Sequence, residues 1–232
     1  MKGVLYLIEL WNGLIDLLKD VLQFFYIYVN DYGVAIILLT VAIRVVILPL
    51  TIKQTKSMYE MQRLQPKLKE LQEKYKDNKE KLQQEMLKFY SEHKVNPFGG
   101  CFPLLLQMPI FFALFQMLMK NKDLLDATSL GIFGLGTRPS AAFGEGVIAF
   151  LPYLILIVLM ALTTYIPQKM MATDPQQQRM GLILMPLMVF FAWTLPTGVL
   201  LYWITTNVWT IAQQYVTLKL AKQAEVANGK GN

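Results

Sequence analysis

The chain has 232 residues, of which 54% are hydrophobic and 16% are charged, and its formal net charge is +6. This composition is too apolar for a soluble domain of this size, so it predicts an integral membrane protein. The single cysteine, Cys101, excludes an intramolecular disulfide and a metal site built from several thiolates. The single histidine, His93, excludes clustered histidine ligands, so we expect no metal and no other cofactor.

The N-terminal segment has apolar residues spaced three and four apart over residues 3–28, and charged side chains on the opposite face. This pattern predicts an amphipathic helix with too many charges to span a membrane. We therefore expect residues 1–32 to lie in the outer membrane interface. A signal peptide is the alternative, but it requires an uninterrupted apolar stretch, and Glu9 and Asp16 break this one.

The first predicted span is residues 33–52, an apolar run interrupted by Arg44 near its middle. Insertion scales put the cost of such a charge at about 2.5–3.5 kcal/mol. All 16 acidic residues lie outside the apolar runs, so no acid in another span neutralises it. We infer that Arg44 faces a watery cavity, together with Thr40 one turn earlier. The alternative is that its long side chain reaches a headgroup or helix-end carbonyls.

Residues 53–96 are the long polar segment of the chain, with 11 lysine and arginine residues against 7 acidic ones. Apolar residues recur in heptads on both sides of the turn signal Asp77-Asn78. This pattern predicts two antiparallel helices in a short coiled-coil hairpin, with a kink or a new start at Pro66. A solvated charged loop is the alternative interpretation.

Four more apolar runs follow. Residues 180–218 hold 39 uncharged positions, too many for one span, and Pro196 and Gly198 mark a turn between two. Gln107 lies inside the second span, where an interhelical hydrogen bond and a place in the cavity wall are equally good interpretations. The predicted order is span two at 97–119, outer loop 120–146, span three at 147–166, cytoplasmic loop 167–180, span four at 181–195, span five at 199–218 and tail 219–232.

The distribution of lysine and arginine predicts the orientation. The hairpin region carries 11, the 167–180 loop 2 and the tail 3, whereas residues 1–32 carry 2 and the outer loop 3. The hairpin, the 167–180 loop and the tail are therefore expected in the cytoplasm. The sequence thus predicts an all-α membrane protein with five transmembrane helices, the N-terminus outside and the C-terminus in the cytoplasm.

The spans lack the groups of intramembrane enzymes and pumps. No serine with a lysine or histidine base, no paired aspartates and no metal ligands lie within them. A proton-coupled transporter needs an intramembrane acid, which is absent as well. We therefore predict that the protein is not an enzyme and that it receives other polypeptides.

Several motifs support a family resemblance. They are Arg44 with PLT at 49–51, LQPK from Leu64, KVNPFGGCFPLLLQMPIF from Lys94, TDPQQQ from Thr173, and PTGVLLYWITTN from Pro196. With these motifs the chain resembles the YidC family of membrane-protein insertases over the five-span core. Many Gram-negative members carry an extra N-terminal span and a large periplasmic domain, which have no counterpart in these residues.

The resemblance implies a groove that is open to the cytoplasm and to lipid and closed to the outside, with Arg44 as its charge. Thr40, Gln107 and Tyr202 are then expected to line the groove, and Trp203 stands where the family often has a second tyrosine. The short tail has three lysines, which argues against strong ribosome binding through it.

The resemblance also implies partners and a bacterial inner-membrane location. We expect nascent membrane proteins as substrates, the Sec translocon, and the ribosome and signal-recognition machinery at the hairpin, with membrane lipids around the spans and no nucleic acid. An anion-selective channel or small-solute transporter that uses Arg44 for selection is the main alternative. A structural scaffold for other membrane complexes is the second alternative.

Overall fold

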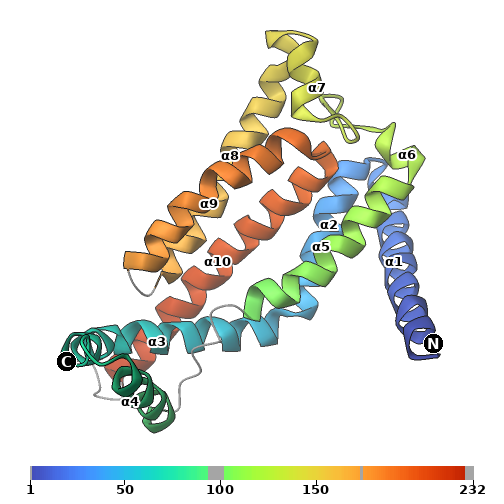
Figure 1. Cartoon of the computed structure of the whole chain (residues 1–232). Coiled ribbons are helices and arrows are strands. Elements are labelled where there is room, and N and C mark those ends of the chain that lie inside the picture. The colour runs from blue at the N-terminus through green and yellow to red at the C-terminus, as the bar shows by residue number, and fades with distance from the viewer. Residues whose placement is uncertain (1, 94–101, 173–174, 228–232) are drawn as a thin grey trace.

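The computed structural model describes residues 2–93, 102–172 and 175–227 (Figure 1). The helices in these ranges are α1 (Lys2–Val29), α2 (Tyr32–Val46), α3 (Leu48–Lys74), α4 (Lys79–Glu92), α5 (Phe102–Lys120), α6 (Lys122–Leu125), α7 (Pro139–Gly144), α8 (Val147–Met171), α9 (Pro175–Thr194) and α10 (Thr197–Ala227). Strands β1 (Thr128–Ser129) and β2 (Phe133–Gly134) pair antiparallel between α6 and α7.

Helix α10 lies at the centre of the bundle and packs against α8, α2, α3 and α5 (Figure 1). On one side, α1, α2, α5 and α10 enclose an apolar core in which Leu22, Ile36 and Leu114 are almost fully buried. On the other side, Met160 and Leu200 are buried where α8, α9 and α10 meet. Burial of these side chains holds α1, α2 and α5 on one side of α10 and α8 and α9 on the other.

The predicted first span is broken. Helix α2 ends at Val46 and α3 begins at Leu48, and the two helix axes differ by 67°. Pro49 is the second residue of α3, where its missing N–H costs no helical hydrogen bond. The run predicted as the first span, residues 33–52, is therefore divided between two helices, and Arg44 lies in the last turn of α2.

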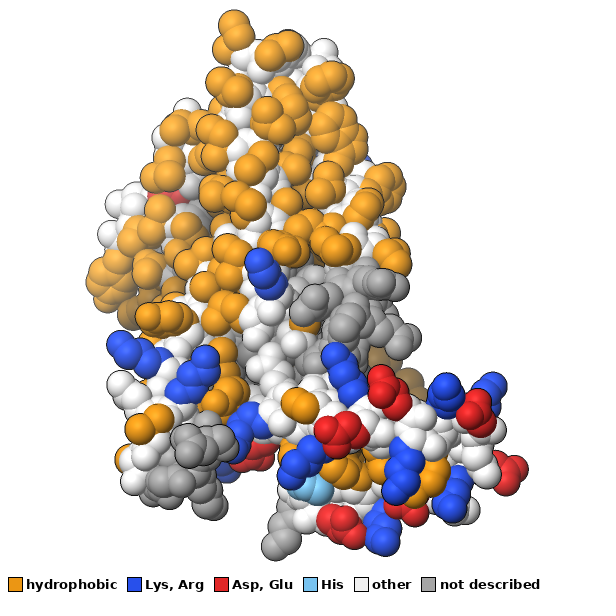
Figure 2. All heavy atoms as spheres, turned by 90° about the vertical axis from the view of Figure 1, so that its left-hand side faces the viewer, with side chains coloured by type: hydrophobic (Ala, Val, Ile, Leu, Met, Phe, Trp, Pro, Cys, Tyr) orange, Lys and Arg blue, Asp and Glu red, His pale blue; other side chains and the backbone are white. Residues whose placement is uncertain are grey.

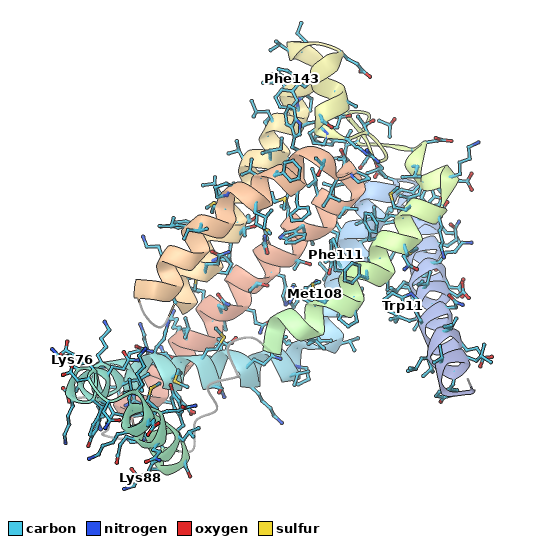
Figure 3. All side chains as sticks on the ribbon, viewed as in Figure 1. Trp11, Lys76, Lys88, Met108, Phe111 and Phe143 are labelled. Atoms are coloured by element: carbon cyan, nitrogen blue, oxygen red, sulfur yellow. The ribbon has the colours of Figure 1, made fainter. Side chains whose placement is uncertain are left out.

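Beyond the bend, α3 runs on through Pro66 as one helix, so the new helical start predicted there does not occur. A turn separates Lys74 from Lys79, and the Asn78 side chain accepts a hydrogen bond from the Lys81 N–H at 3.0 Å. Helices α3 and α4 contact each other, and Lys76 and Lys88 mark this end of the molecule (Figure 3). Whether the pair acts as a coiled coil stays a prediction.

Helix α1 is amphipathic as predicted, and part of its apolar face packs against the bundle. Ile15, Leu18 and Leu22 are buried against α2 and α5, whereas Asp16 stays exposed. Trp11 projects toward α5, where its Nε1 donates a hydrogen bond to Gln116 Oε1 at 3.2 Å (Figure 3). Leu7 and Leu10 of the same helix remain more than half exposed, so the location of residues 1–32 in the outer membrane interface stays a prediction.

The outer loop and the polar segments contain more helix than expected. The 120–146 loop holds α6, the β1–β2 pair and α7. Helix α8 continues beyond residue 166 to Met171, and α10 continues into the predicted tail as far as Ala227. Apolar periodicity identifies the part of a helix that meets lipid or core, and these polar helix ends lie outside it.

Among the described residues, α8 over Val147–Met170 is by itself long and apolar enough to cross a membrane. The bent pair α2–α3 would make a second span, and α5 and α9 contribute shorter apolar stretches. The number of five spans therefore stays a prediction.

One face of the molecule separates apolar from charged surface. Figure 2 shows apolar side chains over the upper part and charged side chains gathered below, toward the hairpin. Large side chains such as Ile148, Ile155 and Ile183 are at least half exposed on α8 and α9. A continuous apolar surface of this kind is what lipid tails solvate, so it agrees with the membrane assignment.

Asp31 ties the start of α2 to the outer loop. Its carboxylate accepts hydrogen bonds from the Val34 N–H at 3.0 Å, the Ser129 hydroxyl at 2.7 Å and the Leu130 N–H at 2.6 Å. Partial burial raises the pKa of Asp31, but these hydrogen bonds outweigh it and hold the pKa below the ordinary value of 3.8. The ionised carboxylate therefore stabilises the end of the bundle where α2 begins.

We predict that Asp31→Ala destabilises the fold by about 1–3 kcal/mol at neutral pH, because three donors lose an ionised acceptor. Thermal unfolding in detergent measures this, with the exposed Asp77→Ala as the control. Since the folded pKa is depressed, the stabilisation is complete above the unfolded pKa and is lost as the pH falls through the folded value. Equal unfolding temperatures for D31A and the native chain at pH 7 would contradict this role.

Candidate functional site

Arg44 is held by a neutral partner from another helix. Its Nη2 donates a hydrogen bond to Gln107 Oε1 of α5 at 3.0 Å, and the arginine side chain is half-buried. Within the described ranges no carboxylate lies within salt-bridge distance of the guanidinium. The positive charge is therefore positioned by an amide and is not neutralised.

Gln107 extends the hydrogen-bond network from Arg44 to α10. Its Nε2 donates a hydrogen bond to the hydroxyl of Tyr202, whose side chain is 3% exposed. Arg44, Gln107 and Tyr202 thus connect α2, α5 and α10 through one chain of hydrogen bonds. The structure brings together three of the residues that the sequence analysis selected, although their sequence separations are 63 and 95 residues.

Arg44 lies at the end of α2. This position would allow the alternative considered from the sequence, in which the side chain reaches a lipid headgroup or helix-end carbonyls. Its hydrogen bond nevertheless leads to a side chain of the neighbouring helix, and no bond to a helix-end carbonyl is found in the described residues. The geometry therefore favours a guanidinium held between helices over one that has left the bundle.

Thr40 and Trp203 do not join this network. Thr40 is 1% exposed, and its hydroxyl donates to the Ile36 carbonyl of its own helix at 2.7 Å. Trp203 packs with Met160 and Leu200 on the α8–α9 side of α10. Successive residues of a helix point about 100° apart, so Trp203 packs toward α8 and α9 whereas the Tyr202 hydroxyl bonds to Gln107 of α5.

Phe111 is a contact that the sequence analysis missed. Figure 3 shows it on α5, and its ring centroid lies 5.4 Å from that of Trp203 and 6.4 Å from that of Tyr202. An aromatic residue in an apolar span carries no pattern that distinguishes it from other core residues. It packs one turn beyond Gln107 and fills the space between α5 and α10.

A metal is not part of this arrangement. The described residues contain no group of three His, Cys, Asp or Glu side chains that could bind a metal ion. Cys101 lies outside the described residues, as does the start of the NPFGGCFP motif at residues 96–101. What the site offers a ligand is one positive charge, an amide and a phenol in a mostly apolar bundle.

Comparison with known proteins identifies the family. Residues 24–224 match the family described as 60Kd inner membrane protein. The chain is also 40% identical over 205 residues to the membrane protein insertase YidC of Caldanaerobacter subterraneus subsp. tengcongensis, over 88% of this chain and 94% of that relative. The chain belongs to the YidC family.

Other YidC proteins are longer. The membrane protein insertase YidC of Geobacter sulfurreducens is 41% identical over 207 residues, which cover 88% of this chain and 37% of that relative. The YidC fold is present as well. A crystal structure of an active YidC insertase with its first transmembrane domain resolved aligns with a TM-score of 0.64 at 26% identity, over 86% of this chain and 46% of that chain.

We predict that Tyr202→Phe lowers the stability of the bundle by about 1 kcal/mol, because the Gln107 amide loses its acceptor in a buried place. Thermal unfolding of the purified protein in detergent measures the loss. Tyr165→Phe on α8 is the matched control, since its hydroxyl makes no hydrogen bond among the described residues. An equal loss in both variants would show that the Gln107–Tyr202 bond contributes nothing.

Proposed function

We propose that this YidC family member inserts nascent membrane proteins through a groove that contains Arg44, alone or together with the Sec translocon. The observation that carries the proposal is the guanidinium of Arg44, which is half-buried and bonded to the neutral Gln107. The names of the YidC relatives and the match to an active YidC insertase support the same activity. The activity makes and breaks no covalent bond, so it needs no catalytic group, nucleotide or metal.

Arg44 attracts the acidic or polar outer tail of a substrate. Two unit charges 4 Å apart interact by about 4 kcal/mol at an effective dielectric constant of 20, compared with about 1 kcal/mol in water. A substrate carboxylate also accepts a stronger hydrogen bond from a guanidinium than an amide oxygen does. A substrate carboxylate can therefore replace Gln107 as the hydrogen-bond acceptor of Arg44. When the tail leaves, the hydrogen bond between Arg44 and Gln107 forms again.

The apolar segment of the substrate moves along the outside of the bundle. Helices α8 and α9 expose large apolar side chains, including Leu151, Val158 and Phe190. Transfer of the segment from water to this lipid-facing surface is favourable by about 25 cal/mol per Å² of apolar area. This gain drives insertion, while the polar groups near Arg44 reduce the cost of carrying the tail across.

The proposed topology has five spans, with the α3–α4 hairpin and the C-terminus in the cytoplasm and residues 1–32 at the outer side. The basic hairpin is then the surface that meets the Sec translocon, the ribosome or the signal-recognition machinery. Its charged side chains gather at the end of the molecule opposite the apolar surface (Figure 2). This location makes the hairpin available to soluble partners in the cytoplasm.

Arg44→Ala should reduce insertion of a single-span substrate with an acidic outer tail about 10- to 100-fold, because the tail loses its attraction in the groove. Insertion into proteoliposomes, measured by protease protection of the tail, tests this. Arg44→Lys keeps the charge and loses the planar guanidinium, so a failure of this variant would show that geometry is required.

The anion-channel alternative is decided with the same proteoliposomes. Wild-type insertion by R44A would overturn the groove mechanism. Chloride flux through the native chain that disappears in R44A would establish a channel in its place.

Gln107→Glu should raise thermal stability while it lowers insertion of the acidic tail several-fold. The new carboxylate keeps the shape of the side chain and pairs with Arg44, so it competes with the substrate for the guanidinium. Unfolding temperature and proteoliposome insertion are measured on the same preparation. Gln116→Glu, on the α1 side of α5, is the matched control for an added charge. Full activity of Q107E would mean that Arg44 does not bind substrate carboxylates.

A further inference from the structure

The hairpin arm α3 is bonded to the end of α8. The side-chain Nε2 of Gln62 donates one hydrogen bond to the Met170 carbonyl at 3.0 Å and another to the Ala172 carbonyl at 3.2 Å. These partners lie 108 and 110 positions from Gln62 in the chain. Figure 1 shows α3 crossing the molecule at the end where α8 finishes, and the two helices are in contact.

The two bonds cap a helix. Helix α8 ends at Met171, and Ala172 is its C-cap residue in an extended conformation. The last four carbonyls of an α-helix have no partner within the helix, and Met170 and Ala172 supply two of these carbonyls. Gln62 therefore satisfies acceptors that α8 cannot satisfy by itself, and we call the two bonds the Gln62 cap.

The Gln62 cap is a second hydrogen-bonded attachment of α3 to the bundle. The first is near the bend, where the Thr51 hydroxyl donates to Gln213 Oε1 of α10 at 3.0 Å. Gln62 lies three turns further along α3, at a distance of about 16 Å. Two attachments this far apart fix the direction of the helix between them, which a single point beside the 67° bend does not.

The cap lies where an exposed apolar stripe of α8 ends. The stripe consists of Leu159, Leu162 and Ile166, which are 41%, 53% and 39% exposed and share one face at spacings of three and four. Met170 continues this spacing, and its carbonyl is one of the two that Gln62 binds. The arm is therefore held beside the apolar surface along which the apolar segment of a substrate is proposed to move.

We propose that Gln62 is a positioning residue for insertion, which holds the hairpin arm at the entrance of the α8 apolar stripe by capping α8. This inference rests on the proposed insertase function, because it requires substrates that pass from the hairpin to this surface. Without the cap the arm swings about the bend, and a substrate segment on the hairpin meets the stripe less often.

Three substitutions separate the cap from side-chain packing. Gln62→Met keeps the length of the side chain and loses the donor. Gln62→Glu keeps the shape but brings a carboxylate to the negative end of the α8 dipole, whereas Gln62→Arg is larger and donates again. Packing alone predicts that the arginine variant is the most impaired. The cap predicts that arginine replaces glutamine, that methionine does not, and that glutamate is worst.

Insertion of a single-span reporter into proteoliposomes that contain the purified chain measures the effect. Two lost bonds at about threefold each lower insertion by Q62M about tenfold, and Q62E falls further. Q62R should stay within about twofold of the native chain. Gln65→Met is the matched control, because Gln65 is also half-buried on α3 and makes no hydrogen bond among the described residues.

The position of the arm is measured in the same proteoliposomes by the distance between two spin labels. The labels are attached to cysteines that replace Glu70 on α3 and Leu162 on α8, both exposed, after Cys101→Ser. The native chain and Q62R should give one narrow distance distribution, and Q62M and Q62E broad ones. A narrow distribution in Q62M, or insertion by Q62R as low as that by Q62M, overturns the proposal.

A covalent link in place of the cap gives a test that does not depend on the hydrogen-bond variants. In the Cys101→Ser chain, Gln62→Cys and Ala172→Cys are joined by a short bismaleimide. The linked protein should insert the reporter about tenfold better than the unlinked one, as two regained bonds predict. Equal insertion by the two forms overturns the proposal.

R44A distinguishes this inference from the proposed function. Normal insertion of an acidic tail by R44A refutes the proposed groove mechanism. Low insertion by R44A together with native insertion by Q62M refutes the role of Gln62 alone.

Discussion

The guanidinium of Arg44 is the constraint around which the bundle is built. A charge at this depth needs a polar partner, and the described spans offer no carboxylate near it. The partner is Gln107, held in turn by Tyr202, so one polar chain joins α2, α5 and α10. A neutral partner satisfies hydrogen bonds without cancelling the charge, which leaves a positive charge within the bundle.

The two ends of the bundle differ in how they are fastened. At the end where α2 and α10 begin, Asp31 accepts a hydrogen bond from Ser129 of the 120–146 loop, and the Thr197 hydroxyl donates to the Thr137 carbonyl at 2.7 Å. Leu135 is fully buried there, so apolar packing reinforces these bonds. At the other end, α3 meets α10 through polar side chains, among them Thr51, whose hydroxyl donates a hydrogen bond to Gln213 Oε1 at 3.0 Å. One end is thus fastened by an ionised carboxylate and buried apolar packing, and the other by neutral polar contacts.

The sequence predicted those residues of the candidate site whose polarity differs from that of the apolar run around them. Arg44 is a charge and Gln107 an amide within apolar runs, and both attract attention in the sequence alone. Tyr202 and Trp203 were selected by resemblance. In the structure Tyr202 belongs to the hydrogen-bond chain, whereas Trp203 packs against the α8–α9 core and Phe111. Phe111 could not be found in this way, because an aromatic residue in an apolar run does not differ in polarity from its neighbours.

The sequence by itself determined the class of the protein, the helical segments and the residues that a membrane would not tolerate without a reason. Composition and spacings of three and four residues are local, so they are legible without a fold. The tertiary structure decided the 67° bend after Val46, the burial of α1 and the partner of Arg44. These depend on contacts between residues far apart in the chain. Such contacts arise only when helices compete to bury the same apolar faces and to satisfy the same polar groups.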